Sequence, residues 1–266
     1  MNSIRIAPGA GKWTVAVVLG LLSAALILTG RAVGRAGDAE DSCVKCHSNP
    51  DFLVTNKKLY DYFQQWKTSI HEQEGVACDD CHGGNPNAED KDAAHGRAVG
   101  ESSISSAINF RNIPATCGRC HDDVLKGFRS SEHYRHVVAK KQERQGPTCV
   151  TCHGSINVDV LNVNSVEQSC ARCHNKETGN HPENPARARD ILNRFLSIHH
   201  YYRFLTHRLS PQESRAFFSR VDKKVNHLVV TWHTFDLDAI EKETREVLQL
   251  LKDKRNEIRK RAAGSR

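Results

Sequence analysis

The chain has 266 residues, of which 38% are hydrophobic, and its 38 Lys and Arg against 31 Asp and Glu give a formal net charge of +7. This length allows one or two domains, but so few apolar side chains make a conventional hydrophobic core difficult to build. The basic residues are dispersed until the last expected helix, which argues against a nucleic-acid-binding protein.

The first feature in chain order is an uncharged apolar segment, Thr14–Gly30, preceded by Arg5 and Lys12. Its length lies at the boundary between a signal peptide, with an apolar region of about 7–15 residues, and a spanning helix of about 17–25. We expect residues 1–36 to be an N-terminal transmembrane helix that anchors the protein in the inner membrane, with a cleaved signal segment as the alternative. Basic residues ahead of the segment keep the N-terminus in the cytoplasm, so the rest of the chain is expected in the periplasm.

Five copies of the motif Cys-x-x-Cys-His follow a short polar linker. They are CVKCH at Cys43–His47, CDDCH at Cys78–His82, CGRCH at Cys117–His121, CVTCH at Cys149–His153 and CARCH at Cys170–His174. All ten cysteines of the chain lie in these motifs, so none remains for a disulfide. Zinc sites also use cysteine pairs, but a zinc site does not require a histidine directly after the second cysteine, five times over. The pattern therefore predicts five covalently bound haem c groups.

The chemistry of the motif assigns a role to each of its residues. The two thiols form thioethers with the vinyl groups of one haem, and the adjacent histidine becomes the proximal ligand of the iron. The expected thioether residues are Cys43, Cys46, Cys78, Cys81, Cys117, Cys120, Cys149, Cys152, Cys170 and Cys173. The expected proximal ligands are His47, His82, His121, His153 and His174.

The segments between motifs are too short to bury a face of their own, so the haems must supply the core of residues 37–184. We expect a mainly α fold, with an irregular multihaem cytochrome c core and little sheet. From residue 185 to 266 the chain has no cysteine, and helical patterns predict a C-terminal helical bundle.

Three helices are expected in this C-terminal region. The first is expected to have Asn184 as its N-cap and Pro185 as its first residue, and to run to about Arg208; a third is expected to begin near Asp238. Between them, Ser210 and Glu213 have the spacing of a capping box around Pro211. An apolar stripe is expected on the first helix, comprising Leu192, Phe195, His199, Tyr202 and Leu205.

The second axial ligand of each iron is expected to be histidine, because the only methionine is Met1. Methionine ligation raises the reduction potential, so we expect low-potential haems. Of the fifteen histidines, five are proximal ligands, and the remaining ten are enough to supply a second axial ligand to every iron. The distal candidates are His71, His95, His133, His199 and His233, with His136 competing with His133 and His181 as a further alternative. An ordinary surface or packed histidine is the alternative interpretation for each.

Residues Cys43–His174 resemble the membrane-anchored multihaem cytochromes c of anaerobic bacteria, including the NapC/NirT-type quinol dehydrogenases and class III-like cytochromes. Beyond the five motifs, the similarity lies in the Ser-x-His sequences at Ser69–His71 and Ser131–His133, each upstream of a motif followed by glycine. The resemblance implies periplasmic electron transfer by closely stacked haems with two histidine ligands. This chain differs from NapC/NirT proteins, which typically have four haems and many of which use a methionine near the quinol site.

These features predict a membrane-anchored electron carrier rather than an enzyme. It would take electrons from the quinone pool, directly or through a membrane subunit, and pass them to a periplasmic or outer-membrane redox partner. One alternative is a reductase of the nitrite or hydroxylamine type, in which one haem iron has an open coordination position. Pentahaem nitrite reductases have the same number of haems, but one of their motifs has lysine in place of histidine. This chain has no such motif. The other is a subunit of a membrane respiratory complex.

Overall fold

The computed structural model describes residues 41–96, 100, 103–139, 146–156 and 162–264. The predicted anchor at Thr14–Gly30 lies outside these residues. Among the helices that are described, none combines the length and the apolar character needed to cross a membrane. The described residues all belong to one compact unit.

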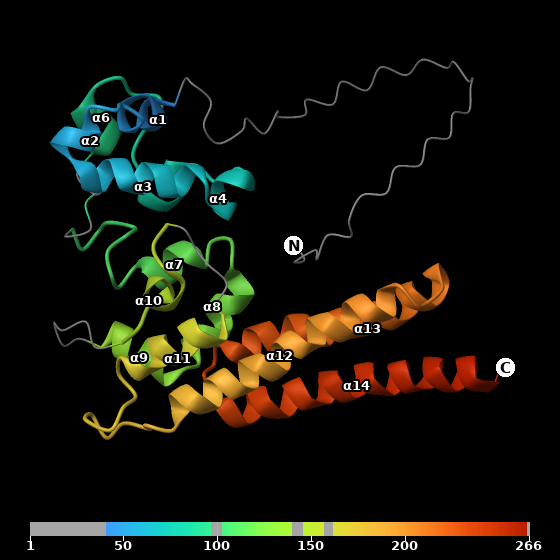
Figure 1. The fold of residues 1–266 in the computed structure, drawn as a ribbon. Coiled ribbons are helices and arrows are strands. Elements are labelled where there is room, and N and C mark those ends of the chain that lie inside the picture. Colours follow the sequence, from blue (N-terminus) through green and yellow to red (C-terminus); the bar gives the residue numbers. More distant parts are fainter. Residues whose placement is uncertain (1–40, 97–99, 101–102, 140–145, 157–161, 265–266) are drawn as a thin grey trace, which may run out of the picture. The chain divides into compact units, whose positions relative to one another are not determined.

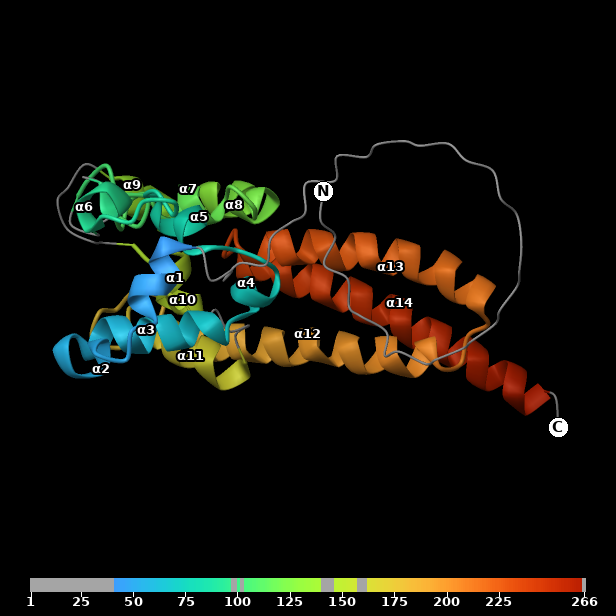
Figure 2. The same ribbon diagram turned by 90° about the horizontal axis from the view of Figure 1, so that it is seen from above.

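The predicted α fold is confirmed, because the described residues contain helices, turns and loops but no strand (Figures 1 and 2). Eleven short helices make up the region of the five motifs. They are α1 (Ser42–His47), α2 (Phe52–Thr55), α3 (Lys57–Lys67), α4 (Ile70–Gln73), α5 (Cys78–His82), α6 (Lys91–His95), α7 (Ile113–Cys117), α8 (Asp122–Arg129), α9 (Glu132–Val138), α10 (Cys149–His153) and α11 (Val163–Ala171).

The helices α5 and α10 are each a single motif, and the reason lies in the residues around them. The Oδ2 of Asp80 accepts a hydrogen bond from the backbone N–H of Ala77 at 2.8 Å, which fixes the start of α5. Gly83 and Gly154 follow the two motif histidines with φ of 73° and 83°. This left-handed conformation ends a helix at little cost only for glycine, so one turn of helix presents both thiols and then stops.

Three long helices form the C-terminal bundle: α12 (Asn184–Thr206), α13 (Pro211–Trp232) and α14 (Leu237–Gly264). Helix α12 begins one residue earlier than expected, with Glu183 as its N-cap, and it ends two residues before Arg208. The capping box of α13 forms as predicted, because Ser210 and Glu213 bond to each other's backbone N–H groups. The core of the bundle contains Ile191, Ile198, Leu205, Leu209, Phe217, Phe218, Val221, Leu228, Ile240, Val247, Leu248 and Leu251.

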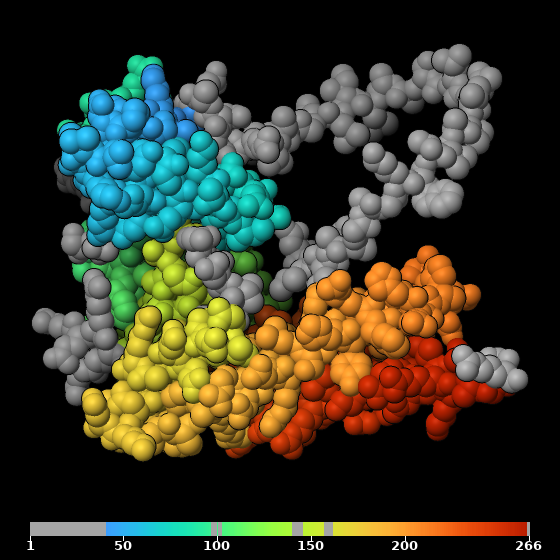
Figure 3. Space-filling model, viewed as in Figure 1, coloured from blue at the N-terminus to red at the C-terminus, as the bar shows by residue number. Residues whose placement is uncertain are grey.

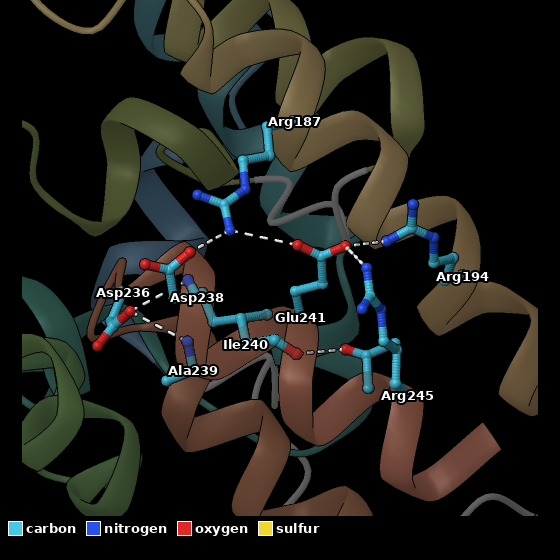
Figure 4. A network of polar contacts seen from close by, with 9 residues as sticks. Arg187, Arg194, Asp236, Asp238, Ala239, Ile240, Glu241 and Arg245 are labelled. Atoms are coloured by element: carbon cyan, nitrogen blue, oxygen red, sulfur yellow. Dashed lines mark hydrogen bonds and ion pairs between the residues drawn. The ribbon is translucent and has the colours of Figure 1, made fainter. Parts of the chain in front are cut away.

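Ion pairs join α12 to the start of α14, as Figure 4 shows. The carboxylate of Glu241 accepts hydrogen bonds from Arg187 at 3.2 Å and from Arg194, and Arg187 also pairs with Asp238. The hydrogen bond from Arg194, ahead of the other contacts, lowers the pKa of Glu241 below its ordinary value. The contacts join side chains that are 47 to 54 positions apart in the chain, and so they hold α12 against the start of α14.

The bundle packs against the motif region at two places. Helix α11 lies along α12, where Arg189 pairs with both carboxylate oxygens of Glu167 at 3.0 Å (Figure 3). Helix α8 lies so close to α13 that a Cβ at Gly127 would be 2.6 Å from the carbonyl oxygen of Val230. The bundle is therefore in contact with the elements that carry the motifs.

Candidate haem centres

The first three motifs lie side by side in the order of the sequence. The pKa of Cys43 in the polypeptide is raised to about 12. The main cause is burial, followed by the nearby Asp41 carboxylate and then by the Cys78 thiol of the second motif. Burial and then the Cys117 thiol of the third motif raise the pKa of Cys81. The cysteines of consecutive motifs are thus close enough to affect one another's ionisation.

The same order continues through the last two motifs. Interaction with the nearby Cys149 thiol of the fourth motif, and then burial, raises the pKa of Cys117. Burial and then the Cys152 thiol raise the pKa of Cys170 to about 11. Haems attached to these residues would form one row, each next to its neighbours in sequence.

Two arginines inside the motifs hold neighbouring motifs together. In the third motif, Arg119 donates a hydrogen bond of 2.6 Å to the carbonyl oxygen of Asp80 in the second. In the fifth, Arg172 donates one of 3.5 Å to the carbonyl oxygen of Thr151 in the fourth. Both arginines stand directly before the second cysteine of their motif, so the contacts fix the spacing of the attachment sites.

Four motif histidines each have a second histidine ring opposite them. The ring centroids are 6.0 Å apart for His47 and His95, 6.4 Å for His71 and His121, 5.9 Å for His133 and His174, and 6.1 Å for His153 and His233. With metal–nitrogen bonds of about 2 Å, two imidazoles on opposite sides of one iron have centroids roughly 6 Å apart. The four pairs therefore fit four irons with two histidine ligands each.

The hydrogen bonds of these rings fit the same role. The Nδ1 of His95 lies 2.8 Å from the carbonyl oxygen of Lys91, and that of His233 lies 2.8 Å from the carbonyl oxygen of Val229. An N–H at Nδ1 that donates to a carbonyl leaves the Nε2 lone pair free to bind a metal. Among the described residues, three or more His, Cys, Asp or Glu side chains do not cluster as a metal site.

Residues 102–175, which hold the third, fourth and fifth motifs, match the family model for cytochrome c7 and related cytochrome c. This part of the chain is therefore similar to multihaem c-type cytochromes.

Two polyhaem relatives of this cytochrome come from Geobacter sulfurreducens. The C-type polyheme cytochrome OmcB is 28% identical over 204 residues, covering 61% of this chain and 25% of OmcB. The C-type polyheme cytochrome OmcC is 26% identical over 157 residues, covering 53% of this chain and 19% of OmcC. The cytochrome therefore matches only about a quarter, or less, of the length of either relative. No solved structure shows significant similarity to it.

The two Ser-x-His sequences of the cytochrome have a common structural basis. Ser69 is the N-cap of α4, accepting from the N–H of Glu72 at 3.2 Å, and Ser131 is the N-cap of α9, accepting from the N–H of Tyr134 at 3.1 Å. Both serines are buried. A serine at the N-cap places the residue two positions later on the first turn of the helix, so His71 and His133 are oriented by the same device.

The turn between α13 and α14 provides a feature that the sequence pattern did not indicate. Phe235 has φ of 59°, a left-handed conformation that costs a residue with a Cβ about 1–2 kcal/mol. Its ring centroid lies 4.3 Å from that of His133 and 6.2 Å from that of Phe128.

The pKa of His133 is lowered to about 4, mainly by burial and then by the nearby His174. The Nδ1 atom of His133 is buried without a hydrogen-bond partner. A buried neutral ring with a free nitrogen suits an iron ligand.

Among the distal candidates, His199 is not placed beside a motif histidine. It is exposed on α12, so its predicted place in the apolar stripe is wrong, and its ring is 6.3 Å from that of His200. The α-helical periodicity directs Ile191 and Ile198 to the core instead. His181 lies 6.3 Å from His174, farther than His133 at 5.9 Å, and it also lies 3.4 Å from the carboxylate of Glu183.

Proposed function

We propose that this cytochrome carries five covalent haems and transfers electrons outside the cytoplasm. Haem iron, when bound, cycles between the ferric and ferrous states and so carries one electron. The observation that carries the proposal is that the motifs lie near their neighbours in the sequence, with direct hydrogen bonds joining the second motif to the third and the fourth to the fifth. Electron transfer requires closely spaced centres, and the hydrogen bonds of Arg119 and Arg172 hold the spacing.

The residues of the chain set the properties of such a relay. Paired histidines would close an iron to outside ligands, so it exchanges electrons without binding a substrate. Low potentials are expected because no methionine follows Met1 in the chain. Anchoring by residues 14–30, a supply of electrons from the quinone pool and delivery to a periplasmic or outer-membrane partner remain parts of this proposal.

The proposal is tested on the full-length protein purified with its haems. Mass spectrometry should give the mass of the polypeptide plus five haems, and a spectroelectrochemical titration should show every haem at low potential. Fewer than five haems, or a haem at strongly positive potential, would contradict it. Reduction by a quinol in membranes that contain the protein, compared with membranes that lack it, tests the electron donor.

A further inference from the structure

The second motif, Cys78–His82, differs from the other four in its surroundings. The ring of His82 makes no ring contact, hydrogen bond or ion pair with another described residue. Desolvation and then the nearby His47 lower its pKa, but His47 belongs to the first motif and faces His95. The second motif therefore lacks the opposite histidine that the other four possess.

The remaining histidines do not fill this position. All fifteen histidines lie in the described part of the chain, and five proximal and four opposite ones leave six. These six are His136, His181, His199, His200, His207 and His227. His181 lies beside His174 and Glu183, His199 and His200 face each other on α12, and His227 lies 3.5 Å from Glu243. His207 caps the end of α12, and His136 affects the pKa of His133 on α9.

From this placement we propose that the haem held by Cys78, Cys81 and His82 has an open coordination position that binds a small neutral ligand. The inference rests on the proposed five-haem function. The second motif lies between the first and the third, so an iron there has an electron-carrying neighbour on either side. A ligand bound at this iron would be in reach of electrons from both directions.

The charged residues around the second motif determine which class of ligand the open iron would bind. Asp79 and Asp80 lie within the motif, and Asp41 is near enough to Cys78 to contribute, after burial, to its raised pKa. The guanidinium of Arg119 is the neighbouring positive group, bonded to the carbonyl oxygen of Asp80. A net negative surrounding disfavours an anion at the iron, so carbon monoxide or hydroxylamine should bind better than nitrite.

The test uses the full-length protein with its haems. In the ferric state, EPR should show a high-spin signal that accounts for one of the five haems, and carbon monoxide should bind the ferrous protein at one molecule per chain. Hydroxylamine should remove the high-spin signal at lower concentration than nitrite does. A greater affinity for nitrite would overturn the ligand class.

Single variants assign the open iron by elimination. Each of His71→Ala, His95→Ala, His133→Ala and His233→Ala should raise carbon monoxide binding from one to two molecules per chain, because each opens a different haem. His199→Ala is the matched control and should leave it at one. If one of the four variants stays at one, that histidine is not a ligand and the open iron lies elsewhere, which overturns the assignment.

The inference and the proposed function fail in different ways. If all five haems are present and low-spin and carbon monoxide causes no spectral change, the iron at His82 carries a second ligand; the inference is overturned and the electron carrier stands. If fewer than five haems are attached, the proposed function itself fails, whatever the spin states.

Discussion

At the scale of single residues, helix capping orients two of the histidines that we propose as iron ligands. The Oγ of Ser131 accepts from the N–H of Tyr134 at 3.1 Å and donates to the carbonyl oxygen of Phe128 at 2.6 Å. The hydroxyl therefore ties the first turn of α9 to the end of α8. His133, two residues after the serine, depends on this turn for its position opposite His174.

We expect Ser131→Ala to loosen this turn and to weaken ligation by His133. Loss of an N-cap costs about 1 kcal/mol of stability, and buried groups left unpaired add to it. EPR should show a fraction of one further haem in the high-spin state. Ser131→Thr, which retains a capping hydroxyl, should restore the low-spin state, and Ser130→Ala, at the exposed neighbouring position, should have no spectral effect. An unchanged spectrum in Ser131→Ala would show that the cap does not orient the ligand.

How far the site could be predicted depends on the distance between its residues in the chain. The thioether and proximal residues follow from a local motif, which presents both thiols and the histidine from one helical turn. The pairing of His153 with His233 could not be predicted, because the two residues are brought together by the packing of α8 and α11 on the bundle. The positive φ of Phe235 likewise has no local signal, since the residue is not glycine.

At the scale of helices, the C-terminal bundle was more predictable than the motif region. Caps and apolar periodicity located α12, α13 and α14 to within two residues, because these signals are local and each helix is long. The stripe predicted on α12 was right for Leu192 and Leu205, which are buried, and wrong for His199, which is exposed. It also left out Ile191 and Ile198, which are buried in the core of the bundle. Contacts between helices, rather than the periodicity alone, determine which face is buried.

The ends of α13 and α14 are joined by a salt bridge with a defined pH dependence. Arg261 donates a hydrogen bond of 2.7 Å to the carboxylate of Glu213. This bond, and then the hydrogen bond from Ser210, lowers the pKa of Glu213 from 4.5 to about 2. A carboxylate whose pKa is lower in the folded state stabilises the fold above pH 4.5, and this contribution is lost as the pH falls toward 2.

Glu213→Gln should therefore lower the Tm of the bundle at neutral pH by a small amount, because the pair is at the surface. The difference from the wild type, followed by far-UV circular dichroism, should shrink as the pH falls from about 4.5 toward 2. Glu177→Gln, on an exposed turn, is the control and should show no such trend. A difference that is constant with pH would mean that the effect comes from the loss of the capping box and not from the charge.

At the scale of the whole molecule, the C-terminal bundle contributes to the haem region rather than only covering it. His233 is the C-cap of α13, and its ring lies opposite His153 of the fourth motif. Two residues later, Phe235 packs on His133, which faces the fifth motif. The end of α13 and the turn that follows it thus lie beside histidines of the last two motifs, which gives the bundle a part in the proposed haem ligation.

We expect His233→Ala to open the fourth haem without unfolding the bundle. The histidine side chain lies at the end of α13, outside the core formed by the three helices, so its loss removes an iron ligand and few apolar contacts. EPR should show one additional high-spin haem, and far-UV circular dichroism should be unchanged. His227→Ala, on the same helix and paired with Glu243 at the surface, is the matched control and should keep the wild-type spin states. If His233→Ala leaves every spin state unchanged, the bundle supplies no ligand and its contact with the fourth motif is one of packing alone.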